Sequence, residues 1–122
     1  MTASLAAGYA LRAPRPDEAP AVYALIVASE VAEFGEATGY SLGDLEGNWR
    51  TIDIGRDAWV AVAPDGSLAG YAYVSDRRHV RVDAEGYVHP DHVGRGIGTA
   101  FVEEDTAMAR DMVAELFFFF ND

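Results

Sequence analysis

The part of the sequence best suited to chemistry is a glycine-rich stretch at residues 87–100. Gly94, Gly96 and Gly98 are spaced two residues apart there. Because glycine has no Cβ, the backbone can turn tightly and approach a ligand closely. The helical pattern that follows would present its first unpaired N–H groups and its positive dipole end to that ligand. The stretch therefore predicts an anion site, and the expected anion is a phosphate or a pyrophosphate.

Charged side chains in the same stretch could add to this site. Arg95 lies inside the loop, where a guanidinium can reach phosphate, and the alternative is a solvated arginine. His89 and His92 flank a Pro-Asp turn and could act as a base or a metal pair. Two histidines separated by a proline have poor ligand geometry, so no metal is expected. The glycine spacing matches neither the P-loop nor the dinucleotide fingerprint.

The flanking sequence predicts the elements that position this stretch. Hydrophobic periodicity indicates strands at residues 8–12, 57–63, 68–74 and 80–88. It indicates helices from about 18 to 33, 41 to 49 and 96 to 116, with Asp17 as the cap of the first. Residues 64–67 form a strong turn signal and join the second and third strands into a hairpin.

The two faces of the last predicted strand differ in character because side chains alternate along a strand. One face carries Val80, Val82, Ala84, Gly86 and Val88. The other carries Arg81, Asp83, Glu85 and Tyr87.

Length and composition limit the possible classes of protein. The 122 residues fit a single domain, 1–122, with one modest core. The net charge of −11 makes nucleic acid an unsuitable partner. It suits either a cationic substrate or simple solubility. No cysteine is present, and no stretch has the roughly 20 apolar residues of a membrane helix. No membrane association and no signal peptide are expected, and a cytoplasmic location is the default.

A family resemblance rests on the same residues. Val88-His89-Pro90-Asp91, followed by Gly94-Arg95-Gly96-Ile97-Gly98-Thr99-Ala100, resembles the acyl-CoA loop of GNAT acyltransferases. The resemblance implies that backbone amides from Gly94 to Thr99 hold the pyrophosphate of coenzyme A. The arginine or glutamine of the family falls at Val93 here. The CoA-binding residues implied are Tyr87, Val88, His89, Val93, Gly94, Arg95, Gly96, Ile97, Gly98 and Thr99.

The resemblance also implies catalytic roles. Acyl transfer needs a base for the attacking amine and donors that polarise the thioester carbonyl. Glu85 is the first candidate base and Asp83 the second; the alternative is an exposed strand carboxylate without a role. The N–H of Val88 would polarise the thioester if the family's strand splay is present. The carbonyls of Val88 and Tyr87 would pair with the pantetheine arm.

The implied fold is an α/β (α+β) domain with a mixed, largely antiparallel sheet flanked by helices. The resemblance covers residues 8–116, whereas the family fold continues with a strand, a helix and two more strands. Here the chain ends in Phe117-Phe118-Phe119-Phe120-Asn121-Asp122. A truncated domain, half of a tandem protein, or a homodimer or tandem partner that covers this C-terminal edge would each explain that end.

Two other groups of residues could form an acceptor site. Trp49, Trp59, Tyr71 and Tyr73 could line a pocket, although aromatic residues on strands more often belong to the core. Glu30, Glu33 and Glu36 could receive a cationic acceptor.

The sequence thus predicts an N-acetyltransferase that moves an acyl group from acetyl-CoA, or another acyl-CoA, to a primary amine by direct attack. The acceptor would be a small molecule or a peptide. An inactive GNAT-like module that docks through its apolar C-terminal edge is the alternative. A different phosphate ligand in the same loop is a third possibility.

Overall fold

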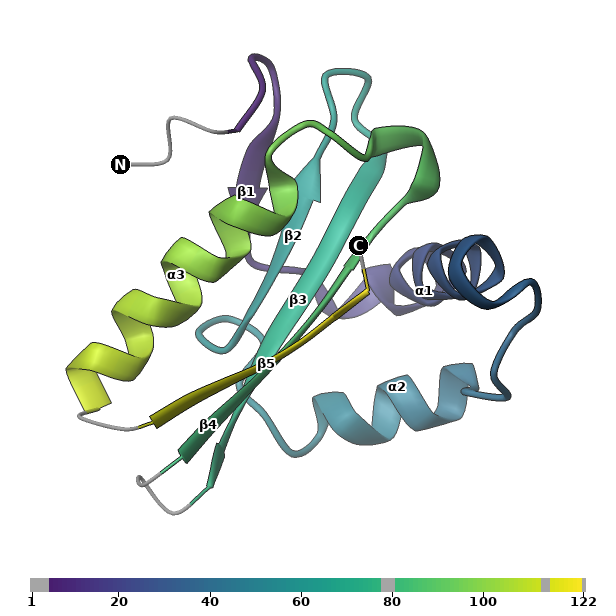
Figure 1. The fold of residues 1–122 in the computed structure, drawn as a ribbon. Helices are drawn as coiled ribbons and strands as arrows, with labels where there is room; N and C mark the ends of the chain where they lie inside the picture. The colour runs from purple at the N-terminus through teal and green to yellow at the C-terminus, as the bar shows by residue number, and fades with distance from the viewer. Residues whose placement is uncertain (1–4, 78–80, 113–114, 122) are drawn as a thin grey trace.

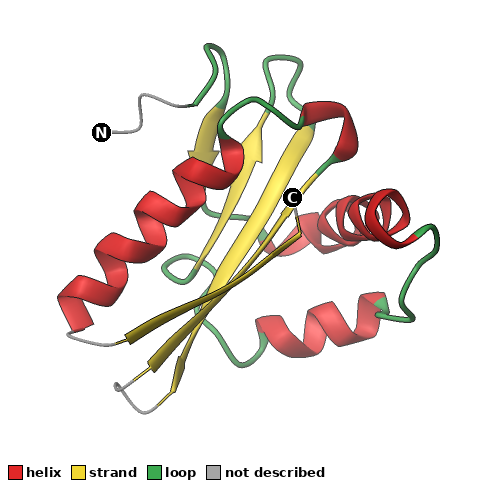
Figure 2. Cartoon of the chain, viewed as in Figure 1, coloured by secondary structure: helices red, strands yellow, loops and turns green. Residues whose placement is uncertain are grey.

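A five-stranded sheet with helices on both faces forms the protein (Figures 1 and 2). The computed structural model describes the backbone of residues 5–77, 81–112 and 115–121, and the side chains of residues 5–75 and 84–107. The strands follow one another across the sheet in the order β1-β2-β3-β4-β5. β1 to β4 pair with one another in antiparallel fashion, and β5 runs parallel to β4. This architecture confirms the expected α/β (α+β) class.

The bounds of the first four strands lie close to those predicted. The strands are β1 (Ala10–Arg12), β2 (Ala58–Val62), β3 (Leu68–Arg77), β4 (Arg81–Val88) and β5 (Glu115–Asn121). A register shift between Ala61 and Val62 marks an irregularity in β2. The β2–β3 turn closes where the Asp65 carboxylate accepts a bond from the Ser67 N–H at 2.9 Å. Val80, the predicted start of β4, lies outside the described residues.

The helices begin and end at recognisable signals. They are α1 (Ala19–Phe34), α2 (Leu42–Trp49) and α3 (Ile97–Met112), with short 3-10 helices η1 (Pro16–Glu18) and η2 (Pro90–His92). Gly35 ends α1 in the left-handed region, where its N–H donates to the Val31 carbonyl. Ser41 and Asp44 exchange bonds in a capping box at the start of α2. The predicted cap Asp17 lies instead within η1, and Glu18 holds the cap position of α1 without a side-chain bond to the amides of that helix.

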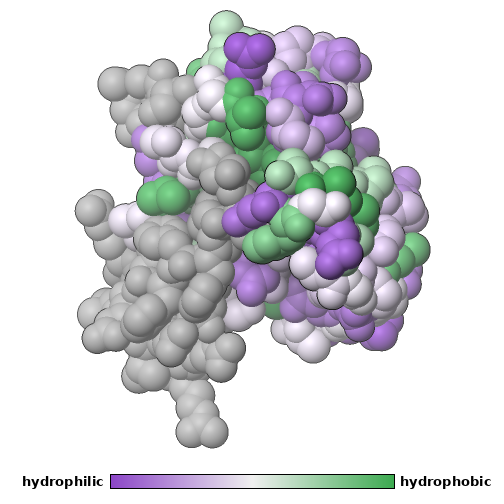
Figure 3. All heavy atoms as spheres, turned by 45° about the vertical axis from the view of Figure 1, so that its right-hand side comes forward, coloured by the Kyte–Doolittle hydropathy of each residue, from purple (hydrophilic) through white to green (hydrophobic). Residues whose placement is uncertain are grey.

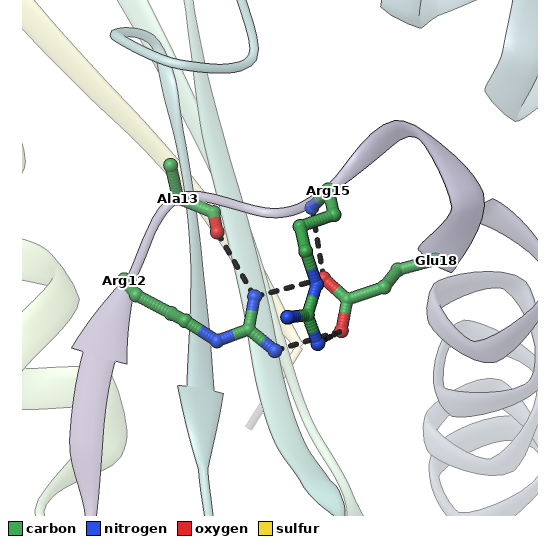
Figure 4. A network of polar contacts seen from close by, with 4 residues as sticks. All are labelled: Arg12, Ala13, Arg15 and Glu18. Atoms are coloured by element: carbon green, nitrogen blue, oxygen red, sulfur yellow. Dashed lines mark hydrogen bonds and ion pairs between the residues drawn. The ribbon is translucent and has the colours of Figure 1, made fainter.

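An ion pair fixes the start of α1 against β1 (Figure 4). The Arg12 guanidinium donates to both Glu18 carboxylate oxygens, at 2.8 and 2.7 Å. The Arg15 N–H donates to the same carboxylate at 2.8 Å. The hydrogen bond from Arg12 lowers the pKa of Glu18 to about 2, so this carboxylate stays ionised at neutral pH. Two parallel bonds of this kind define direction as well as distance, which orients α1 relative to the sheet.

Each face of the sheet has its own buried cluster. Figure 1 shows α3 on one side of the sheet and α1 and α2 on the other. The α1–α2 side buries Val22, Leu25, Ile26, Leu45, Val60 and Tyr71. The α3 side buries Ala61, Ala69, Ala72, Val88, Ile97 and Phe101. Because successive strand residues alternate in direction, Val88 faces α3, whereas its neighbour Tyr87 packs on the α1–α2 side.

The C-terminal prediction needs a correction. The helical pattern was expected to continue to about Leu116, but α3 ends at Met112 and residues 115–121 form β5. Residues 117–120 pair with Asp83 to Gly86 of β4 in parallel register. Phenylalanine favours strands, and pairing with β4 supplies the backbone partners that a helix would otherwise give. In the described part of the chain, no helix is both long enough and apolar enough to span a bilayer.

Candidate functional site

The glycine-rich stretch forms a loop between β4 and α3. β4 ends at Val88, η2 follows, and α3 begins at Ile97. Gly94 and Gly96 have φ angles of 78° and 81°, a region that side chains with a Cβ disfavour. The Gly96 carbonyl accepts the first helical bond, from the Ala100 N–H at 3.0 Å. The amides of residues 97–99 therefore precede the helical ladder and are free to face an anion.

The N-terminal segment holds this loop in place. The Ala6 N–H donates to the Arg95 carbonyl at 2.8 Å. The Tyr9 hydroxyl lies 2.8 Å from Nδ1 of His92. The Arg95 side chain is exposed, so its guanidinium is accessible to a phosphate. The contact with Tyr9 gives His92 a structural task.

His89 likewise has a structural role in the turn. Its Nδ1 accepts a bond from the Asp91 N–H at 3.1 Å, which caps η2. Its own N–H donates to the Ala69 carbonyl at 2.8 Å, across to the start of β3. Among the described residues, no three histidine or carboxylate side chains are grouped as metal ligands.

The bond from His89 to Ala69 also determines how the end of β4 is directed. Along a strand, backbone groups point alternately to one neighbour and the other. Since the backbone N–H of His89 points to β3, the backbone N–H and carbonyl of Tyr87 point to β3 too. The Tyr87 carbonyl is therefore used within the sheet. Val88 then points to the opposite edge, on the side of β5. The last β4–β5 pair is Tyr87 with Asn121, and in a parallel ladder the two residues that flank Tyr87 face Asn121, so the Val88 N–H is directed at Asn121. The Val88 carbonyl thus points to this edge, whereas the Tyr87 carbonyl points to β3.

A cavity of about 230 Å³ opens beside this edge. Its wall from α1 consists of Ser29, Ala32 and Glu33, and its wall from the loop consists of Val88, Pro90 and Val93. Ser29 is buried, whereas Val93 is half exposed. Exposed apolar side chains near this end of α1 include Val31 and Phe34. Figure 3, which brings the right-hand side of Figure 1 forward, shows apolar surface interrupted by polar groups there.

Gly70 allows α3 to pack close to the sheet next to this loop. It pairs with Val88 in the β3–β4 register. A Cβ at Gly70 would lie 2.7 Å from Cγ2 of Ile97 and 3.1 Å from the Phe101 ring. Ile97 is the first residue of α3, so the close approach at Gly70 determines where the loop meets the helix.

We expect Gly70→Ala to destabilise the protein by about 1–3 kcal/mol, because an extra methyl overpacks a filled core. The Ile97 branch is stiff in a helix and cannot easily move aside. Urea unfolding followed by circular dichroism measures the change. Gly43→Ala is the matched control, since its Cβ would meet only Ser41 Oγ at 3.7 Å. Unchanged stability in Gly70→Ala would show that α3 shifts freely on the sheet.

Glu85 is not the exposed strand carboxylate of the alternative interpretation. It is half-buried on the α1–α2 side of the sheet and accepts a hydrogen bond from the Tyr73 hydroxyl. Tyr73 is its direct partner in the β3–β4 register. The backbone of Asp83 lies in β4, but its side chain is outside the description.

The other candidate acceptor residues separate into two groups. Glu33 lines the cavity and Glu36 is exposed, whereas Glu30 is buried and accepts bonds from Thr38. Trp49, Tyr71 and Tyr73 belong to one aromatic cluster, and Trp59 packs on the opposite face with α3. The structure thus brings only Glu33 of the three glutamates to the cavity.

A larger cavity of about 460 Å³ lies at the other end of α1. Arg12, Arg15 and Glu18 line it, together with His89 and the β2–β3 turn. Both guanidinium groups already contact the Glu18 carboxylate. We therefore regard this cavity as part of the framework that orients α1.

Tyr73 was predicted as a possible wall of an acceptor pocket and not as a partner of Glu85. Three other residues that support the site carried no such prediction: Gly70 comes from β3, and Ala6 and Tyr9 come from the N-terminal segment. Each acts through a contact with the β4–α3 region that depends on strand register or helix packing. Only the alternation of β3 gave a signal, because it places Tyr71 and Tyr73 on one face.

Comparison with known proteins gives a consistent result. Residues 19–119 match the family model described as Acetyltransferase (GNAT) family. A mycothiol acetyltransferase of Frankia casuarinae is 35% identical over 72 residues, which span 59% of this chain and 20% of that protein.

Solved structures share the fold. A GCN5-related N-acetyltransferase from Sphaerobacter thermophilus is 38% identical with a TM-score of 0.82, over 89% of this chain and 34% of that one. The PaiA N-acetyltransferase from Thermoplasma acidophilum, solved in complex with coenzyme A, has a TM-score of 0.71 at 14% identity, over 88% of this chain and 77% of that one. The chain thus spans about a third of the first structure and a fifth of the Frankia protein.

Proposed function

The chain belongs to the acetyltransferase (GNAT) family, and from this premise we propose that it binds acetyl-CoA and transfers the acyl group to a primary amine. The family membership confirms the resemblance found in residues 88–100. It also favours a transferase over a docking module. The acyl donor, the acceptor and the direct attack are part of the proposal.

The observation that carries the proposal is the loop between β4 and α3. Two glycines at positive φ lead directly into the first turn of a helix, beside an open cavity. Free amides and a positive dipole end together suit a pyrophosphate. The PaiA relative, which shares the fold, was solved with coenzyme A. In our proposal the amides of residues 94–99 and the Arg95 guanidinium hold the pyrophosphate, and the pantetheine arm extends along Val88.

The proposed reaction forms one bond and breaks another. The amine nitrogen attacks the thioester carbonyl, a C–N bond forms, and the C–S bond breaks with its electron pair on sulfur. The Val88 N–H donates to the carbonyl oxygen as negative charge develops there, which requires the ends of β4 and β5 to separate because this N–H faces β5. Glu85 takes the proton that the amine must lose, directly or through water. Asp83 is the second candidate base, and Glu33 faces the cavity where a cationic acceptor would enter.

Calorimetric titration with acetyl-CoA tests the proposal, with desulfo-CoA and ATP as comparisons. We expect acetyl-CoA and desulfo-CoA to bind similarly, because the pyrophosphate and pantetheine carry the recognition. ATP should bind at least ten-fold more weakly, since it lacks the pantetheine arm. ATP binding as tight as acetyl-CoA would favour a different phosphate ligand, and no binding at millimolar ligand would contradict the proposal.

A further inference from the structure

A tyrosine holds the candidate base from the neighbouring strand. The Tyr73 hydroxyl donates a hydrogen bond to Oε2 of Glu85. The two residues face each other in the β3–β4 register. Among the described residues, no group bonds to the other oxygen, Oε1. The carboxylate is therefore held at one oxygen by Tyr73, and no described residue holds the other.

The tyrosine is itself held by packing. Tyr71 is fully buried behind it, with ring centroids 5.8 Å apart and an interplanar angle of 30°. The Trp49 indole N–H donates to the Tyr71 hydroxyl at 2.9 Å, which fixes that ring in turn. Tyr87 stacks on the Tyr71 ring at 6.4 Å. Packing of the Tyr73 ring against the fixed Tyr71 ring limits movement of the Tyr73 side chain, so its hydroxyl stays beside Glu85.

The electrostatic surroundings keep this hydroxyl a donor. Burial raises the pKa of Tyr73 strongly, and the bond to Glu85 and its charge raise it further. Burial likewise raises the pKa of Tyr40 to about 12, with contributions from Glu85, Asp44 and Glu30. These phenols therefore stay protonated at neutral pH. A protonated phenol can only stabilise the carboxylate beside it by donating.

We propose that Tyr73 is the positioning residue of the reaction: it holds Oε2 of Glu85 and thereby directs Oε1 at the proton of the attacking amine. This inference rests on the proposed function. The proton moves from the amine nitrogen to Oε1, directly or through one water, while the C–S electron pair leaves on sulfur. Tyr73 gives up no proton and touches neither substrate. Tyr73 acts only by fixing the orientation of the Glu85 carboxylate.

A double-mutant cycle in the 122-residue chain tests the inference. Tyr73→Phe, Glu85→Gln and the double variant are compared with the wild type, with acetyl-CoA as donor and n-butylamine as the probe acceptor. Release of the CoA thiol gives kcat and KM, and calorimetry gives the Kd for acetyl-CoA. Tyr23→Phe is the matched control, because Tyr23 packs on the same cluster without a bond to Glu85.

We expect Tyr73→Phe to lower kcat roughly ten-fold, the order of one charge-assisted hydrogen bond. The KM and Kd for acetyl-CoA should stay unchanged. Glu85→Gln should lower kcat by about 100-fold or more. Tyr73→Phe should have no further effect in that background, because the hydroxyl acts only through the carboxylate. Tyr23→Phe should match the wild type.

The outcomes separate this inference from the proposed function. Two results with an active wild type would overturn the role of Tyr73 and leave the transferase intact. In the first, Tyr73→Phe turns over as fast as the wild type. In the second, the effects of the two substitutions on kcat multiply in the double variant. An increase in KM and Kd instead of a decrease in kcat would show a merely structural tyrosine. Binding of acetyl-CoA without any thiol release by the wild type would contradict both.

Discussion

Replacing Asp105 with asparagine is expected to stabilise the protein, by an amount that grows with pH. Asp105 lies on α3, one turn after Phe101, and its side chain is fully buried. Neither carboxylate oxygen has a hydrogen-bond partner among the described residues. A buried charge without a partner is costly, so the group avoids ionisation. Burial, with a smaller contribution from Glu104, raises its pKa from 3.8 to about 7.

The pH dependence follows from the two states. Below the unfolded pKa of 3.8 both states keep the proton, and Asp105 causes no loss. Between that pH and about 7 the unfolded chain releases the proton while the folded protein keeps it, so stability falls as pH rises. At about 1.4 kcal/mol per pKa unit, the loss above pH 7 is at most about 4 kcal/mol.

Urea unfolding of Asp105→Asn at pH 5 and pH 8 measures this effect. An amide has no charge to bury, although its polar atoms still lack partners, so we expect a net gain of about 2 kcal/mol at pH 8. The gain at pH 5 should be smaller or absent. Glu46→Gln removes an exposed carboxylate from α2 and should show no such trend. A loss of stability at both pH values would mean that Asp105 accepts hydrogen bonds.

The loop was predictable from sequence because its determinants are local. Proline after His89 ends β4, and glycine at positions 94 and 96 permits the positive φ angles that the structure contains. The Ser41–Asp44 capping box at the start of α2 depends on equally short spacing. In each case the residues that determine the conformation lie within six positions of one another.

The environment of the candidate base was not predictable, because it depends on strand register. Tyr73 and Glu85 are 12 residues apart and meet only through the pairing of β3 with β4. A shift of one residue would turn every side chain of β4 to the other face. Sequence alone therefore left Glu85 as a strand carboxylate of unknown exposure.

Longer-range contacts were equally hidden. Gly70 in β3 lies against α3, and Ala6 in the N-terminal segment bonds to Arg95 although the two are far apart in the sequence. The parallel pairing of β5 with β4 also requires the whole α3 crossover between them. Helical periodicity within residues 96–116 carries no information about that pairing, which explains why the helix was predicted too long.

Gly96→Glu is expected to weaken acetyl-CoA binding by at least about 100-fold, by two separable effects. Gly96 has a φ of 81°, where a residue with a Cβ is strained by about 1–2 kcal/mol. Its carbonyl also accepts the first bond of α3, so strain there disturbs the amides of the next residues. A carboxylate added beside the proposed pyrophosphate site further repels the ligand and competes for those amides.

Two further variants separate these effects in the same calorimetric assay. Gly96→Ala adds only the strain and should lose about ten-fold in affinity. Gly66→Glu adds the same charge at a φ of 89° with nothing within 4 Å of the new Cβ, in the β2–β3 turn. It should bind acetyl-CoA like the wild type. Since the repulsion acts between charges, added salt should restore part of the affinity of Gly96→Glu but not of Gly96→Ala. Binding of acetyl-CoA by Gly96→Glu at wild-type affinity would place the pyrophosphate away from the first turn of α3.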